Sequence, residues 1–173
     1  AVYPISDVSV SENHEVRPLD IYGLSKLTGE QLMEKFHLQT GVDTICCRFF
    51  NAFGPNETNP HLIPEIEKQI REGNRTIALG NLTPKRDFIH THDMANAVNA
   101  LINLENVGYD VFNLGRGIEY AVTEVVNEFE KSQAPASWWL ALQDQVTNGI
   151  SCTMFNNLFY TRHVSQLFLS SVL

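Results

Sequence analysis

The stretch Asp43–Phe50 reads DTICCRFF, and it decides the fold class of the chain. It is a short apolar run between turn residues, which is typical of a parallel strand buried on both faces. Before it, apolar residues recur at helical spacing from Ile21 to about His37, and Gly41 then predicts the end of that helix. A helix that leads directly into a buried strand indicates an α/β chain.

Helices and short strands continue to alternate after this strand. We predict helices at Leu62–Glu72, Met94–Leu101 (capped by Thr91, His92 and Asp93) and Thr123–Phe129. We predict short strands at Thr76–Leu79, within Lys85–His90 and at Val111–Leu114. Residues 5–20 and 51–60 are polar and contain prolines, so we predict loops there. This order predicts an α/β fold with a parallel sheet.

Charge and hydropathy exclude several classes of partner. The 173-residue chain has 12 Lys and Arg against 20 Asp and Glu, a formal net charge of −8. So acidic a chain is a poor candidate for general binding of nucleic acid or of an anionic membrane, although a local basic site for one diphosphate remains compatible. No apolar stretch approaches the roughly eighteen residues of a membrane span, and no secretory signal is recognisable, so we expect a cytoplasmic location.

The cysteines are expected to be packing residues. The chain has three, and two of them, Cys46 and Cys47, are adjacent, so a disulfide framework is not expected. Neighbouring residues of a strand point to opposite faces, and we expect these two to pack as small apolar groups.

The composition changes after about Ser132. Residues 133–173 contain two charged residues, Asp144 and Arg162, and no Glu or Lys. One interpretation is a buried helical extension. The other, which the composition favours, is a segment foreign to the fold, such as a shifted reading frame or an intron that was read through. We therefore treat residues 1–132 as one domain and residues 133–173 as an atypical tail.

The strongest local chemical signal is Tyr22-Gly-Leu-Ser-Lys26 at the start of the first helix. A spacing of four places Tyr22 and Lys26 on one helical face, one turn apart. A free phenol is a poor base at neutral pH, and a neighbouring ammonium favours its phenolate form. Such a pair can exchange a proton with a sugar hydroxyl. The alternative is an exposed Tyr and Lys on an ordinary helix, because a lone Tyr-x-x-x-Lys match is common by chance.

The motif does not stand alone. Several blocks resemble, in order and with similar gaps, the extended short-chain dehydrogenases/reductases that act as NAD-dependent nucleotide-sugar epimerases and dehydratases. Tyr22–Glu30 (YGLSKLTGE) resembles the active-site helix of that family. The other blocks are Ala1–Tyr3 (AVY), Arg48–Pro55 (RFFNAFGP), Asn59–Ile66 (NPHLIPEI), Arg86–Ala95 (RDFIHTHDMA) and Val111–Gly117 (VFNLGRG). The resemblance implies the C-terminal part of a Rossmann-like, doubly wound parallel sheet with part of a small substrate-binding lobe.

The resemblance assigns three residues to the cofactor NAD and to the acid/base step. Tyr22 matches the general acid/base of the family, and Lys26 matches the lysine that holds the nicotinamide ribose and favours the phenolate. Phe50 matches an aromatic or apolar residue near the nicotinamide, although a core Phe on a buried strand is an equal alternative. The hydride moves between the sugar and NAD, and the protein positions both.

The resemblance also assigns a set of residues to a nucleotide-sugar substrate: Asn51 to the sugar, His61 and Leu62 near the nucleotide, Ile77 and Leu79 beside the base, and Arg86 to the diphosphate. A guanidinium suits a diphosphate because it can bind two phosphate oxygens at once. The structural alternatives are that Asn51 bonds its own turn and that Arg86 forms a surface ion pair with Asp87.

Two further patterns carry no expected function. His90 and His92 lie on one side of a predicted strand, but no third ligand follows at a matching distance, so we expect no metal. Gly115-Arg116-Gly117 lacks the third glycine of a dinucleotide fingerprint.

The chain departs from the family at its beginning. No G-x-G-x-x-G or G-x-x-G-x-x-G loop, which would bind the NAD pyrophosphate, occurs in the 173 residues. The catalytic Ser or Thr of the family falls two positions before Ala1. We therefore expect a C-terminal fragment of an enzyme whose N-terminal half holds NAD.

The expected activity is that of a UDP-sugar 4-epimerase that works through a transient 4-keto sugar. Dehydratases of this family carry a catalytic Glu at the position of Ala1, where this chain has only a methyl group. The alternatives are a nucleotide-sugar 4,6-dehydratase and a catalytically inactive fragment. We expect the parent enzyme to be a homodimer, because the helix that starts near Tyr22 matches a dimer helix of the family.

Overall fold

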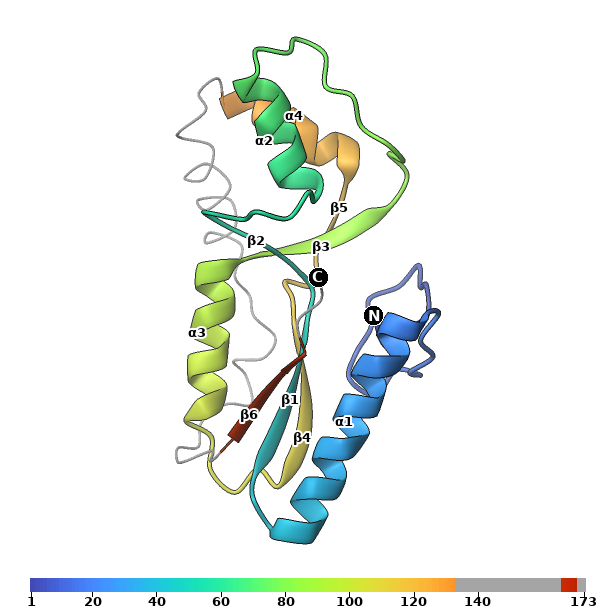
Figure 1. Cartoon of the computed structure of the whole chain (residues 1–173), viewed down its shortest axis with the longest axis vertical. Coiled ribbons are helices and arrows are strands. Elements are labelled where there is room, and N and C mark those ends of the chain that lie inside the picture. The colour runs from blue at the N-terminus through green and yellow to red at the C-terminus, as the bar shows by residue number, and fades with distance from the viewer. Residues whose placement is uncertain (133–165, 171–173) are drawn as a thin grey trace.

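Strand β1 (Thr44–Phe49) lies at the centre of a three-stranded parallel sheet in the computed structural model, which describes residues 1–132 and the backbone of residues 166–170 (Figure 1). Its neighbours are β4 (Tyr109–Leu114) and β6 (Gln166–Ser170), both parallel to it. The first five residues of β1 are buried. The predicted buried strand and the α/β fold class are therefore confirmed.

Alternate residues of β1 face two different helices. Ile45 and Cys47 pack in an apolar cluster with α3 (Thr91–Ile102). On the opposite face, Arg48 reaches α1 (Ile21–Thr40). Figure 1 accordingly shows this sheet between α1 and α3. The two-residue period of the strand thus gives one apolar and one partly polar interface.

The adjacent cysteines behave as packing groups. Cys46 is 1% exposed and Cys47 is 0% exposed, and both are free thiols. Burial raises the pKa of Cys46 to about 11 and that of Cys47 to about 12. Both side chains therefore stay protonated and unreactive near neutral pH, as expected of small apolar groups.

Helix α1 is capped at both ends by local sequence signals. The Asp20 carboxylate accepts a hydrogen bond from the Gly23 N–H at 2.6 Å. Gly41 follows the helix with φ of 71°, and its N–H bonds the carbonyl of His37 at 2.7 Å. The predicted stop at Gly41 is confirmed, and the helix ends at Thr40 rather than at about His37 because nothing before the glycine breaks it.

The other elements form a second unit, which we call the small lobe. Its sheet contains β2 (Asn51–Phe53), β3 (Lys85–His90) and β5 (Glu119–Ala121), with β2 parallel and β5 antiparallel to β3. Helices α2 (Leu62–Arg71) and α4 (Val122–Ser132) lie together beyond this sheet (Figure 1). They share an apolar core that contains Phe53, Ile63, Ile66, Val125 and Phe129.

Three local predictions were wrong in the small lobe. Asn51–Phe53, at the start of a predicted loop, forms β2, and β5 was not predicted. Thr76–Leu79 is not a strand. There the Gln69 side chain bonds both the N–H and the carbonyl of Ala78, at 2.7 and 2.8 Å, and so satisfies the backbone groups that a neighbouring strand would otherwise pair.

The segment after Ser132 is described only at β6, whose backbone pairs with β1. The proposed boundary near Ser132 and the foreign origin of residues 133–173 thus fall mostly outside the described residues, and they stay predictions. Within the described residues, no helix has the length and apolar character needed to cross a membrane.

Candidate functional site

Tyr22 and Lys26 lie together on the first turns of α1. The Lys26 Nζ atom is 5.0 Å from the centroid of the Tyr22 ring, and both side chains are half-buried. Gly23 packs so closely against the chain start that a Cβ atom there would lie 2.3 Å from the carbonyl oxygen of Ala1. The predicted pairing of phenol and ammonium is therefore present, at a fixed place beside the N-terminal segment.

Phe50 lies where β1 ends and the chain turns into the small lobe. Its N–H bonds the Leu114 carbonyl at 3.1 Å, which extends the pairing of β1 with β4 by one residue. The Phe50 ring also packs on Gly115, where a Cβ atom would come within 3.0 Å of the ring and 2.7 Å of an Asp87 carboxylate oxygen. Phe50 is thus at the carboxyl ends of parallel strands, the edge at which open α/β sheets bind ligands.

Asp87 organises this edge, a role that sequence reasoning missed. Its carboxylate accepts hydrogen bonds from the backbone N–H groups of Arg116, at 2.9 Å, and Gly117, at 2.7 Å. Burial raises the pKa of Asp87, and these two hydrogen bonds oppose that shift. No ion pair joins Asp87 to Arg86, since neighbouring strand residues point to opposite faces. The alternative interpretation of Arg86 is therefore wrong.

Asn51 bonds across the sheet rather than within its own turn. Its side-chain nitrogen donates to the Asp87 carbonyl at 3.1 Å. This bond fixes the amide beside Phe50, at the start of β2. The alternative of a turn-bonded Asn51 is wrong, and the contact with a sugar stays a prediction.

Arg86 and the predicted base-flanking residues belong to the small lobe. Arg86 is exposed on β3, directly opposite Tyr120 of β5. Arg86 is therefore a solvent-accessible cation on the small lobe.

Three of the predicted nucleotide residues share one apolar environment. Leu62, Ile77 and Leu79 are half-buried and pack on the lobe core. His61 is exposed at the N-cap of α2, where its side chain makes no capping bond and instead contacts the Glu57 carboxylate. The structure thus brings these residues together in the lobe, apart from the Tyr22–Lys26 pair on α1.

His90, the last residue of β3, and His92, in the first turn of α3, have a local role. The His90 ring accepts a hydrogen bond from the His92 N–H at 3.2 Å and so caps α3. Burial lowers the pKa of His90, which favours the neutral ring that accepts this bond. Among the described residues, no group of three possible metal ligands occurs.

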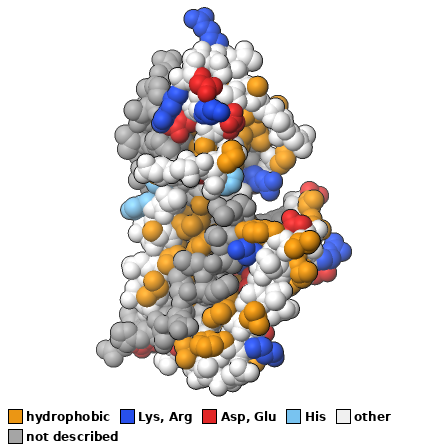
Figure 2. Space-filling view, viewed as in Figure 1, with side chains coloured by type: hydrophobic (Ala, Val, Ile, Leu, Met, Phe, Trp, Pro, Cys, Tyr) orange, Lys and Arg blue, Asp and Glu red, His pale blue; other side chains and the backbone are white. Residues whose placement is uncertain are grey.

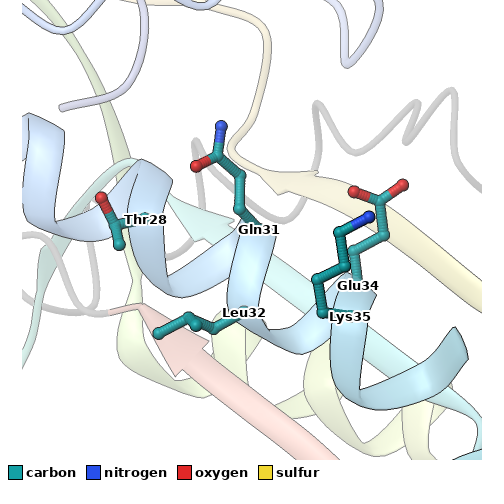
Figure 3. A pocket seen from close by; sticks show the side chains of 5 residues that line it. All are labelled: Thr28, Gln31, Leu32, Glu34 and Lys35. Atoms are coloured by element: carbon teal, nitrogen blue, oxygen red, sulfur yellow. The ribbon is translucent and has the colours of Figure 1, made fainter. Parts of the chain in front are cut away.

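An open hollow of about 400 Å³ lies farther along α1. Its described lining consists of Thr28, Gln31, Leu32, Glu34 and Lys35, all from this one helix (Figure 3). It does not include Tyr22, Lys26 or any predicted substrate residue.

Comparisons with known proteins identify what this arrangement is similar to. A family model described as the NAD dependent epimerase/dehydratase family matches residues 1–115. The UDP-glucose 4-epimerase of Bacillus subtilis (strain 168) is 32% identical over 152 residues, which cover 75% of this chain and 44% of that protein. The dTDP-glucose 4,6-dehydratase of Streptomyces griseus is 28% identical over 130 residues, which cover 75% of this chain and 39% of that protein.

A similar solved structure is that of MoeE5 in complex with UDP-glucose and NAD. It matches with a TM-score of 0.70 and 29% identity, over 76% of this chain and 45% of that chain. The chain therefore spans less than half the length of these relatives.

Proposed function

Because the chain belongs to the NAD dependent epimerase/dehydratase family, we propose that it carries the acid/base pair and the sugar-nucleotide site of an NAD-dependent UDP-sugar 4-epimerase. The observation that carries the proposal is the Tyr22–Lys26 pair, with the ammonium 5.0 Å from the centre of the phenol ring. The relatives are more than twice as long as the matched region. Below, "the complete enzyme" means this chain together with a glycine-rich dinucleotide-binding half.

Tyr22 takes the proton from the 4-hydroxyl group of the sugar in this proposal. To accept this proton Tyr22 must act as a phenolate, and the positive charge of the nearby Lys26 ammonium stabilises that anion. NAD, held beside Lys26 and Phe50, would supply the hydride chemistry at C4 of the sugar. Tyr22 then gives the proton back to the C4 oxygen, so the same side chain serves both directions of the reaction.

The residues at the strand ends fit the nicotinamide part of NAD. Lys26 offers an ammonium donor for the ribose hydroxyl groups, one turn of α1 after the acid/base. Phe50 offers a half-buried aromatic surface at the carboxyl ends of β1 and β4. An apolar surface there excludes water from the reacting carbon, which protects the transient ketone.

The small lobe would hold the nucleotide. Leu62, Ile77 and Leu79 are half-buried, so their exposed parts can pack on a base while their other parts pack on the lobe core. His61 is exposed beside Leu62 at the start of α2. Asn51, whose nitrogen is engaged by β3, keeps a carbonyl oxygen that can accept a hydrogen bond from a sugar hydroxyl.

Replacing Arg86 with alanine in the complete enzyme should weaken binding of the UDP-sugar by about 2–3 kcal/mol, the scale of a lost charge-assisted contact. Affinity for NAD should barely change, because Arg86 lies on the lobe rather than on α1. Calorimetric titration with each ligand measures both effects. Arg75→Ala, at another exposed arginine of the lobe, is the control and should bind like wild type. Equal loss of both affinities, or of neither, would make Arg86 structural.

The nature of the product separates the epimerase from the second candidate, a 4,6-dehydratase. Similarity to the Streptomyces griseus dehydratase keeps that candidate open. Elimination of water across C5 and C6 needs an acid/base group at the position of Ala1, and a methyl group cannot supply it. Incubation of the complete enzyme with UDP-glucose and NAD should yield UDP-galactose by proton NMR. Accumulation of a 4-keto-6-deoxy sugar would identify a dehydratase instead.

We further propose that the complete enzyme is a homodimer that uses α1. Four apolar side chains on α1 are strongly exposed: Ile21, Leu24, Leu32 and Leu38. Figure 2 shows hydrophobic side chains along the α1 side of the molecule. An apolar helix surface of this kind is typical of an interface between subunits.

A further inference from the structure

We infer that the buried ion pair between Glu30 and Arg48 is a positioning device that sets the rotation of α1 about its own axis and so aims Tyr22 and Lys26 at the strand ends. The inference rests on the proposed function for the roles of Tyr22 and Lys26. Its structural part is independent of that function, because it concerns how one helix is held against one sheet.

The pair has the geometry of a clamp. The Arg48 Nε and Nη2 atoms donate to the two carboxylate oxygens of Glu30, at 2.9 and 2.7 Å. Glu30 is 3% exposed and Arg48 is 8% exposed. Two parallel hydrogen bonds from a planar guanidinium fix the orientation of the carboxylate as well as its distance. The clamp therefore resists both sliding and rotation of α1.

The clamp is part of a larger polar network that reaches the N-terminal segment and β4. Arg48 also donates to the Tyr3 hydroxyl at 2.6 Å, which donates to Asn113 of β4 at 2.7 Å. Tyr109 of β4 donates to the backbone carbonyl of Glu30 at 3.2 Å. Although burial by itself lowers the pKa of Arg48, the hydrogen bonds to Glu30 and Tyr3 raise it above the ordinary value, so the guanidinium stays charged.

Apart from Gly23, Glu30 is the one fully buried residue of α1, among its residues that the structure describes. The apolar side chains of Leu27, Met33 and Phe36 on this helix are half-buried. Apolar packing is not directional, whereas the two parallel hydrogen bonds of the clamp are, so we assign the rotation of α1 on the sheet to the clamp. Glu30 lies four residues after Lys26 and eight after Tyr22, on the same side of the helix. A clamp at Glu30 thus fixes the direction of both catalytic side chains.

Two sets of variants of the complete enzyme test this role. Glu30→Gln keeps the shape of the side chain but breaks the charged pair, and we expect kcat to fall at least ~10-fold with KM for UDP-glucose within about twofold, as for a contact that matters in the transition state. The double variant Glu30→Leu/Arg48→Met replaces the pair with apolar groups, which commonly restores stability. We expect its unfolding midpoint to recover and its kcat to stay low.

A control and a readout without catalysis complete the test. Cys47→Ala leaves a cavity on the α3 face of the same strand, so it should lower the unfolding midpoint without lowering kcat. With 3-fluorotyrosine incorporated, the ¹⁹F resonance of Tyr22, assigned by its loss in Tyr22→Phe, should shift in Glu30→Gln but not in Cys47→Ala.

The outcomes separate the clamp from the proposed function. Recovery of kcat together with stability in the double variant, or an unmoved Tyr22 resonance in Glu30→Gln, would overturn the positioning role. If the double variant does not fold, the comparison of Glu30→Gln with Cys47→Ala decides by kcat and resonance. A wild-type enzyme that lacks epimerase activity would refute the proposed function alone, because the ¹⁹F comparison would still test the clamp.

Discussion

Replacing Tyr22 with phenylalanine in the complete enzyme should lower turnover at least ~100-fold, the scale of losing a general acid/base. The change removes one hydroxyl group from a half-buried side chain, so the fold and the packing beside Lys26 should survive. Because NAD can still bind, the loss should appear in kcat rather than in cofactor affinity. Initial rates of UDP-galactose formation, with NAD affinity measured in parallel, give both quantities.

Tyr120→Phe is the matched control for this prediction. Tyr120 is also half-buried, and its hydroxyl accepts a hydrogen bond from Arg116 on the small lobe, at 3.2 Å. It lies on β5 rather than on α1, so its loss should leave kcat within a few fold of wild type. If Tyr22→Phe retained near-normal turnover, Tyr22 would have no part in the mechanism.

Residues 1–173 by themselves should show no NAD-dependent turnover. Their sequence has no glycine-rich loop at a helix N-terminus to bind the pyrophosphate, so most of the cofactor affinity is absent. The family resemblance also implies a Ser or Thr that orients the sugar hydroxyl and matches none of residues 1–173, so we expect that the reacting geometry is not held even with Tyr22 and Lys26 in place. Without the strands and helices of the other half, exposed apolar surface should also favour aggregation or partial folding.

Calorimetric titration with NAD and an epimerase assay on the purified 173-residue chain test this second prediction. We expect no micromolar affinity and no product. The complete enzyme, assayed in the same buffer, is the positive control. Micromolar NAD affinity with measurable turnover would contradict the prediction, and it would mean that a second copy of the chain or residues 133–173 rebuild a cofactor site.

The parts of the fold that follow from local patterns could be predicted. The run DTICCRFF became β1 because five buried residues in succession need a strand covered on both faces. Helix α1 could be bounded because Gly41 adopts a left-handed conformation that stops it. Both signals act within a few residues, so no knowledge of distant contacts was needed.

The wrong predictions concern segments whose secondary structure depends on contacts with residues distant in the sequence. β2 and β5 have three residues each, too few for a period to show, and they exist because β3 pairs with both. The reverse holds at Thr76–Leu79, whose apolar spacing favours a strand. There the side chain of Gln69 from α2 forms hydrogen bonds with the backbone N–H and carbonyl of Ala78, so these groups do not pair with another strand.

In the candidate site, too, features set by local sequence could be predicted and features set by distant contacts could not. The Tyr22–Lys26 pairing follows from helical spacing, and the structure forms it. The Glu30–Arg48 clamp joins residues eighteen positions apart and was missed, although a charged Arg48 inside an apolar strand was a visible signal of a buried partner. Roles that need a bound sugar nucleotide, such as those of Asn51 and Arg86, rest on resemblance and stay predictions.

The path of the hydrogen on C4 tests the proposed epimerase most directly. UDP-glucose that carries deuterium at C4 is incubated with the complete enzyme and NAD in ordinary water, and the products are analysed by NMR. The proposal predicts UDP-galactose that retains the deuterium at C4, because the hydride removed from that carbon returns to it. Deuterium lost to water, or found at C6 of a 4-keto-6-deoxy sugar, would contradict it.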